Sequence, residues 1–129
     1  LGAYYRVNKD SISDMQGAIY EVGAILCSSR VHSGWWFDAA QNALPLIATT
    51  DVSPQGGHAF ALVGYTRDGF IVQNSWGRDW GWKGFAVIPY ADWLVNGMDA
   101  WVVARGAPVN RIAPTTYSSI ALKSADSIQ

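Results

Sequence analysis

Two apolar runs separated by a short turn constrain the fold of this chain more than any other feature. Residues 58–65 are almost wholly apolar, residues 70–74 alternate between apolar and polar, and an Arg-Asp-Gly turn lies between them at 67–69. Two runs of this kind pair as an antiparallel β-hairpin. Because a hairpin returns the chain to the end at which it started, we expect His58 and Asn74 to lie side by side.

The rest of the sequence predicts a strand-rich α+β domain. Ser11, followed by apolar residues at helical spacing and closed by Gly23, predicts one amphipathic helix ahead of the strands. Further strands are predicted at 1–7, 24–27, 84–90 and 99–104, with 24–27 fully buried and a helical turn at 91–95. From residue 107 the aromatic residues become rare and Pro, Ser and Thr increase. We therefore interpret 1–106 as the domain and 107–129 as a tail or linker.

Composition argues against several classes of function. The 129 residues carry nine Lys and Arg against ten Asp and Glu, so no basic face is expected to bind a nucleic acid. The longest apolar stretch, 59–65, is far shorter than the roughly 18 residues that cross a bilayer, so we expect no membrane segment. Cys27 is a single cysteine, which leaves no intrachain disulfide and too few ligands for a structural zinc site. We expect no cofactor, and the compartment stays open, with a reducing or prokaryotic setting favoured.

The pair at the open end of the hairpin has the chemistry of a catalytic base. An asparagine carbonyl beside an imidazole accepts one ring N–H of His58, which fixes the tautomer and leaves the other nitrogen for a nucleophile. Trp76, two residues after Asn74, would shield that hydrogen bond from water. Taken alone, these residues are also compatible with a satisfied core histidine at a strand end and an ordinary turn asparagine.

The wider motif resembles the papain-like cysteine peptidases. Three blocks carry the resemblance: Gly-His-Ala-Phe-Ala-Leu-Val-Gly-Tyr at 57–65, Phe-Ile-Val-Gln-Asn-Ser-Trp-Gly at 70–77, and Trp-Gly-Trp-Lys-Gly-Phe at 80–85. The resemblance implies an α+β papain-like fold, of which this chain is the C-terminal, antiparallel β-barrel-like half with one leading helix. It also implies that His58 is the catalytic base, that Asn74 orients it and that Trp76 shields the pair.

The nucleophile that the resemblance requires has no counterpart here. In the family it is a cysteine of the N-terminal half, in a Cys-Gly-Ser-Cys-Trp-like block that this sequence lacks. Cys27 follows an apolar run instead of a helix start, so we expect it to be structural and inert. His32 lies among Ser and Gly residues without a partner motif, which predicts a solvent-exposed loop histidine.

Two hypotheses follow from these observations. In the first, the chain is a piece of a longer cysteine peptidase, whose missing N-terminal half supplies the nucleophile and whose peptide or protein substrate lies between the halves. The 129-residue chain alone would then be inactive and would self-associate through its uncovered face. In the second, the chain is a non-catalytic papain-like binding module. Exposed, coplanar indoles at Trp35, Trp36 and Trp82 would bind a glycan or a peptide.

Overall fold

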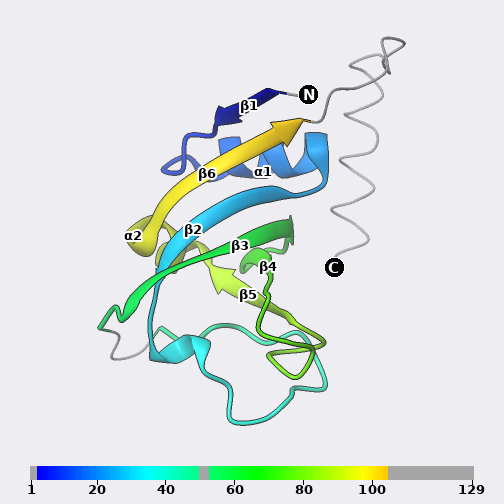
Figure 1. Cartoon of the computed structure of the whole chain (residues 1–129), viewed down its shortest axis with the longest axis vertical. Coiled ribbons are helices and arrows are strands. Elements are labelled where there is room, and N and C mark those ends of the chain that lie inside the picture. The colour runs from blue at the N-terminus through cyan, green and yellow to red at the C-terminus, as the bar shows by residue number, and fades with distance from the viewer. Residues whose placement is uncertain (1–2, 50–52, 105–129) are drawn as a thin grey trace.

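Six antiparallel strands form one sheet in the computed structural model, which describes residues 3–49 and 53–104 (Figure 1). Their order across the sheet is β1-β6-β2-β3-β4-β5. The strands are β1 (Ala3–Arg6), β2 (Ile25–Val31), β3 (Gly56–Tyr65), β4 (Gly69–Gln73), β5 (Phe85–Pro89) and β6 (Gly97–Ala104). They are joined by helices α1 (Ile12–Val22) and α2 (Tyr90–Asn96) and by the 3-10 turn η1 (Ser33–Trp35). The predicted α+β class is confirmed, but the sheet stays open instead of closing into a barrel.

The predicted hairpin is present as β3 and β4. Its turn closes with a hydrogen bond from the Thr66 N–H to the Gly69 carbonyl (2.8 Å), and the Asp68 N–H donates to the Thr66 hydroxyl (3.0 Å). The strands pair from Tyr65 opposite Phe70, with one irregularity after Leu62. The hairpin therefore brings the residues before β3 and after β4 to the same end of the sheet.

The predicted leading helix is α1, and its ends are set by local chemistry. The Ser11 hydroxyl accepts a hydrogen bond from the Asp14 N–H (3.1 Å), which satisfies one of the unpaired donors at the helix start. Gly23 ends the helix in the left-handed conformation, with φ 86°, which glycine adopts without steric cost. Met15 and Ile19 are buried, so this side of α1 packs on the sheet.

The prediction that 24–27 would be fully buried is wrong, because β2 alternates between the two faces of the sheet. Ile25 and Cys27 point into the core with α1, whereas Leu26 is 54% exposed. Leu26 pairs with Ala61 on β3 and with Trp101 on β6, and paired residues share one face. The face away from α1 is therefore uncovered along β2 and its two neighbouring strands.

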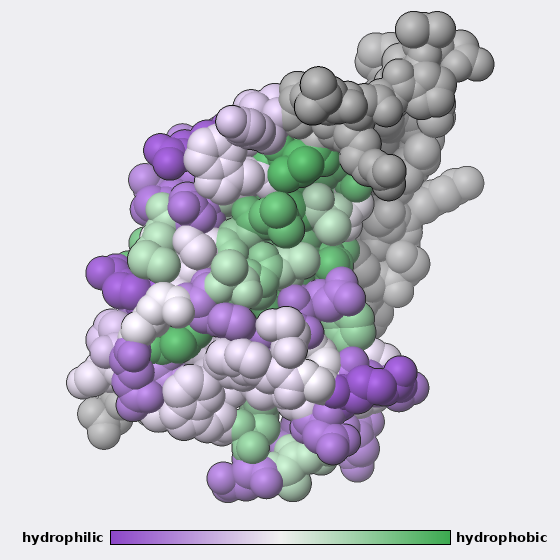
Figure 2. Space-filling model, viewed as in Figure 1, coloured by the Kyte–Doolittle hydropathy of each residue, from purple (hydrophilic) through white to green (hydrophobic). Residues whose placement is uncertain are grey.

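Figure 2 shows apolar side chains gathered on this uncovered face, over β6 and the strands beside it. Its large exposed side chains are Tyr4, Leu26 and Val103, and Trp101 lies between them with its ring 5.8 Å from that of Tyr4. A shallow depression of about 390 Å³ is lined by these four residues. We call this set the open face.

The remaining predictions about organisation have mixed outcomes. The strands expected at 1–7, 84–90 and 99–104 are present as β1, β5 and β6, and the expected helical turn is α2. The tail predicted at 107–129 lies outside the described residues. No helix in the described ranges is long and apolar enough to cross a membrane.

Candidate active site

His58 and Asn74 are hydrogen-bonded, as the hairpin predicts. His58 Nε2 lies 2.7 Å from Asn74 Oδ1, and the same oxygen accepts the Ser75 backbone N–H at 2.8 Å. Because that backbone donor requires an acceptor, the amide oxygen and not the amide nitrogen faces the imidazole. His58 therefore carries its proton on Nε2 and donates it to Asn74. Within residues 3–49 and 53–104, no group is hydrogen-bonded to its Nδ1.

The strand ends and the turn that follows hold Asn74 in place. Asn74 follows the last residue of β4, and its N–H donates to the carbonyl of Gly84, just before β5 (3.0 Å). Residues 75–83 form a loop between these two points, and at its end the Gly84 N–H donates to the Trp80 carbonyl (2.9 Å). Asn74 is thus held by its own N–H at the Gly84 carbonyl and by the Ser75 N–H at its side-chain oxygen.

The Trp76 ring covers the His58–Asn74 pair. Its ring stacks on the His58 imidazole with centroids 4.5 Å apart and planes 26° apart, while 38% of the side chain stays exposed. Trp36, 49% exposed, lies next to Trp76 with ring centroids 5.3 Å apart.

Two further indoles lie beneath the imidazole. Trp35 is fully buried and meets the His58 ring edge-on, with centroids 6.2 Å apart and planes at 89°. Trp80 stacks on Trp35 at 5.9 Å, and its Nε1 donates to the Trp35 carbonyl (2.7 Å). Sequence reasoning missed this support. Trp80 belongs to the motif at 80–85, but nothing in the sequence around Trp35 marks it as a neighbour of His58.

Two buried N–H groups of the site have no acceptor within residues 3–49 and 53–104. They are Nε1 of Trp35 and Nδ2 of Asn74. Buried donors are nearly always paired, because leaving one unpaired costs its full desolvation energy. Exceptions of this kind are characteristic of functional sites, where geometry takes precedence over stability.

The structure places Cys27 in the core, as expected. Its side chain is 3% exposed, and it pairs with Phe60 on one side and Ala100 on the other. Burial raises the pKa of the thiol well above its ordinary range, and the nearby Asp99 carboxylate adds to the shift. A thiol that stays protonated at neutral pH is a poor nucleophile.

The prediction that His32 is a solvent-exposed loop residue is wrong. The residue is fully buried, and its Nε2 lies 2.8 Å from Oδ2 of Asp92. His32 directly follows the last residue of β2, so it leaves the sheet at the edge of the core, and α2 supplies a carboxylate from 60 positions further along the chain. The sequence around the histidine contains no sign of that partner.

The three indoles proposed for a binding platform do not form one. Trp35 is buried, whereas Trp36 is exposed. Trp82 is half-buried, with the Lys83 ammonium 5.1 Å from the centre of its ring. The exposed aromatic surface near the site is formed by Trp36 and Trp76, whose rings are tilted by 47° to one another.

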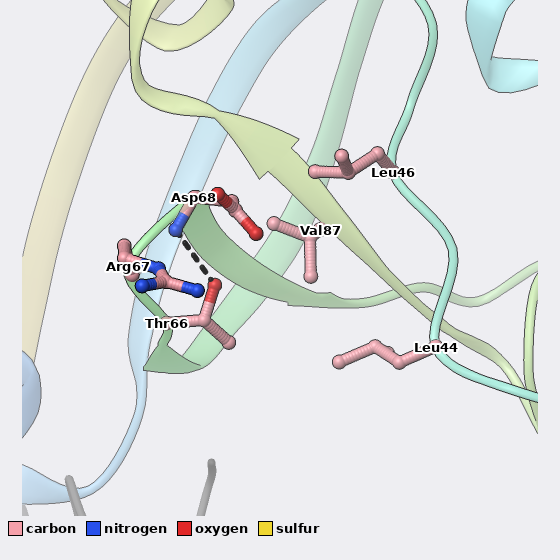
Figure 3. Close-up of a pocket in the computed structure, with 6 residues that line it drawn as sticks. All are labelled: Leu44, Leu46, Thr66, Arg67, Asp68 and Val87. Atoms are coloured by element: carbon pink, nitrogen blue, oxygen red, sulfur yellow. Dashed lines mark hydrogen bonds between the residues drawn. The ribbon is translucent and has the colours of Figure 1, made fainter.

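Two depressions flank different parts of the hairpin. One, of about 480 Å³, begins at Leu26, at the edge of the open face. It runs past Cys27 to Asn74 and Ser75, so it borders the site. The other, of about 210 Å³, lies at the far end of the hairpin (Figure 3). There, the side chains of Leu44, Leu46 and Val87 converge beside the Thr66–Asp68 turn, and the lining contains no histidine or cysteine. Of these two depressions, the first contains Asn74, the hydrogen-bond partner of His58, in its lining.

Comparison with known proteins gives consistent results. The family model described as papain family cysteine protease matches residues 1–100. Xylellain, a cysteine protease from Xylella fastidiosa, is 32% identical with a TM-score of 0.61, over 78% of this chain and 39% of its own. Bromelain from Ananas comosus, solved with an inhibitor, shares the fold with a TM-score of 0.55 at 20% identity, over 78% of this chain and 49% of its own.

A viral relative matches a shorter segment. An uncharacterized peptidase C1-like protein of Acanthamoeba polyphaga mimivirus is 49% identical over 37 residues, which are 27% of this chain and 12% of that protein. The chain thus spans less than half the length of the solved relatives and a smaller share of the viral one. On the match that covers residues 1–100, the chain belongs to the papain family of cysteine proteases.

Proposed function

We propose that this chain supplies the catalytic base of a cysteine peptidase, in which His58 transfers protons, Asn74 orients it and Trp76 shields the pair. The observation that carries the proposal is the imidazole of His58. One of its nitrogens is held by an amide oxygen at 2.7 Å, and the other has no hydrogen bond to any of the residues that the structure describes. A base needs this combination of a fixed tautomer and a free nitrogen.

The reaction then follows from where the proton can go. A cysteine thiol that the sequence of this chain does not include gives its proton to Nδ1 of His58, and the thiolate attacks the carbonyl carbon of the peptide bond. The imidazolium returns the proton to the leaving amine as the C–N bond breaks, which leaves an acyl-enzyme. Water, deprotonated by His58, hydrolyses the thioester and restores the thiol. Asn74 keeps Nε2 occupied throughout.

Cys27 is not the nucleophile in this proposal. Its thiol is buried, its pKa is raised, and its neighbours in the sheet are Phe60 and Ala100 instead of His58. The nucleophile therefore belongs to the part of a papain-type domain that this chain does not supply, which in the solved relatives is more than half of the length.

The open face is where we place that missing part. Tyr4, Leu26 and Val103 are each more than half exposed, which is a large apolar surface to leave in water. The depression that continues from Leu26 to Asn74 connects this surface to the site. A segment packed there would bring its thiol to the free nitrogen of His58. By itself, the 129-residue chain should associate through this face, which analytical ultracentrifugation of the Leu26→Ser variant tests.

The experiment that tests the function is a kinetic comparison in the full-length protein. Turnover of a fluorogenic peptide is measured for the unaltered protein and for His58→Gln. Glutamine places an amide nitrogen near the position of Nε2 and can keep the bond to Asn74, but it has no basic nitrogen that could accept a proton from a thiol and return it. We expect loss of turnover with retained folding. Full activity in this variant would overturn the assignment of His58, and a full-length protein that neither cleaves peptides nor reacts with thiol-directed inhibitors would favour the non-catalytic module.

A further inference from the structure

The second histidine belongs to a buried hydrogen-bonded chain that begins on α2. Asp92, in the first turn of this helix, accepts a hydrogen bond at each carboxylate oxygen. Oδ1 accepts from Nδ2 of Asn96 (2.7 Å) and Oδ2 from Nε2 of His32 (2.8 Å). The side chains of His32 and Asp92 are 0% and 1% exposed. Such a network in the core is uncommon and is favourable only when every member is satisfied.

The other nitrogen of His32 holds the turn that follows it. The Gly34 N–H donates to Nδ1 (3.1 Å), so this nitrogen carries no proton and Nε2 must be the donor to Asp92. The carbonyl of His32 also accepts the Trp35 N–H (3.0 Å). Both nitrogens and the carbonyl of one residue therefore join α2 to the turn η1.

The turn itself has no room to shift. A side-chain carbon on Gly34 would collide with the Ala48 carbonyl oxygen, so this turn packs directly on the loop that contains Ala48. Trp35 ends the turn and continues the chain of contacts into the site. Its ring meets His58 edge-on, Trp76 at 6.0 Å and Trp80 at 5.9 Å.

We propose that His32 and Asp92 are positioning residues of the active site, which fix Trp35 and, through Trp35, the plane of the His58 imidazole. A buried ionisable pair of this kind contributes little net stability compared with apolar packing of the same volume. The pair instead fixes the orientation of the groups that it joins, because each hydrogen bond restricts an angle as well as a distance. The inference rests on the proposed function of His58, but the position of its ring is measurable without any turnover.

Two substitutions separate the two bonds of His32. In His32→Asn, the side-chain oxygen reaches the position of Nδ1 and keeps the Gly34 bond, but the link to Asp92 is lost. In His32→Gln, the amide nitrogen reaches the position of Nε2 and keeps the Asp92 bond, but the turn is released. The control is Ile19→Ala, which opens the core on α1 without touching η1.

The readout is the nitrogen NMR spectrum of the full-length protein labelled at tryptophan and histidine. The indole N–H of Trp80 reports on Trp35, because it donates to the Trp35 carbonyl. The ring nitrogens of His58 report on its tautomer. We expect both His32 variants to move the Trp80 signal and to shift His58 from pure Nε2–H toward a mixture of tautomers. The Ile19→Ala control should leave both signals in place.

Three results would overturn the proposal: unchanged Trp80 and His58 signals in the folded His32 variants, changes confined to one variant only, or equal changes in the Ile19→Ala control. If the His32 variants do not fold, Asp92→Asn gives the same test. One of the two carboxylate oxygens is then replaced by an NH2 group, which cannot accept a hydrogen bond, so either His32 or Asn96 loses its acceptor. In peptide turnover we expect the folded variants to lose roughly tenfold in kcat with little change in KM, since misplacement acts on chemistry more than on binding.

Failure of the proposed function and failure of the positioning role give different results. An unaltered protein without peptidase activity would contradict the role of His58 as a base, yet the spectra would still show whether His32 and Asp92 position its ring. A fully active His32→Gln protein with unchanged spectra would contradict the positioning role alone.

Discussion

The chain has two histidines whose side-chain hydrogen bonds are almost equal in length but whose surroundings differ. His58 is half-buried near the start of β3, 2.7 Å from the Asn74 oxygen, and its second nitrogen has no hydrogen bond within the described part of the chain. His32 is fully buried, 2.8 Å from the Asp92 carboxylate, and its second nitrogen is occupied by the Gly34 N–H. A polar partner beside an imidazole therefore does not identify a catalytic base. The nitrogen left without a bond, together with access to it, is what separates the two roles.

The largest expected effect is on catalysis at His58. His58→Ala should lower kcat/KM of the full-length protein by about 10⁴-fold, because it removes the group that transfers the proton. Stability should change little, since the residue is half-buried and bears one polar bond. Peptide turnover and urea unfolding of the same preparation check both statements. A large loss of stability with activity retained would mean that His58 is a structural histidine and not the base.

The next effect should appear in stability at His32. His32→Ala leaves the Asp92 carboxylate buried with only Asn96 as a partner, and removing a hydrogen bond from a buried charged group costs about 3 kcal/mol. Urea unfolding of the variant, followed by tryptophan fluorescence, measures the loss. The double variant with Asp92→Leu should recover part of it, because the unpaired charge is then gone. A loss under 1 kcal/mol in the single variant would mean that the pair is not a structural link.

A smaller effect is expected at the orienting residue. Asn74→Ala releases the Nε2 proton of His58 and allows its ring to turn, so kcat should fall on the order of 100-fold with less change in KM. Asn74→Asp is the matched variant, because its carboxylate still accepts the same proton and should restore part of kcat. If Asn74→Ala instead raised KM and left kcat unchanged, the side chain would act in substrate binding and not in orientation of the base.

The smallest expected effect separates Cys27 from the site. The raised pKa of its thiol keeps the thiolate fraction low, so alkylation by iodoacetamide should stay slow from about pH 5 to 9, a range around the free thiol value of roughly 8.5. The rate should be the same, within about twofold, in His58→Ala, since the two side chains form no pair. Rapid labelling at acid pH that is lost in His58→Ala would mean that this cysteine and this histidine form the catalytic ion pair.

Local pattern predicted the elements whose cause is local. The hairpin follows from two apolar runs around 67–69, and α1 follows from Ser11, its apolar spacing and Gly23, and all of these are present. The proximity of His58 and Asn74 follows from the same hairpin, because its turn returns the chain to the end of the sheet at which β3 began.

The errors occurred where a residue's surroundings come from distant parts of the chain. Leu26 is apolar and was expected to be buried, but the sheet places it on the face away from α1. His32 has polar neighbours in sequence and was expected in water, but α2 covers it with Asp92. In both cases the exposure of the side chain depends on the packing of a remote element and not on the residues beside it in the sequence.

The α+β class, the hairpin that joins His58 to Asn74 and the family motifs could be read from the sequence, because they depend on patterns within single stretches of the chain, such as 57–85. What surrounds that pair depends on how separate elements pack. The tertiary structure placed Trp35 beneath His58, put Asp92 against His32 and left Leu26 on the open face. These contacts form when separate elements pack in three dimensions, and burial and hydrogen bonding at a given residue depend on that packing more than on its neighbours in the chain.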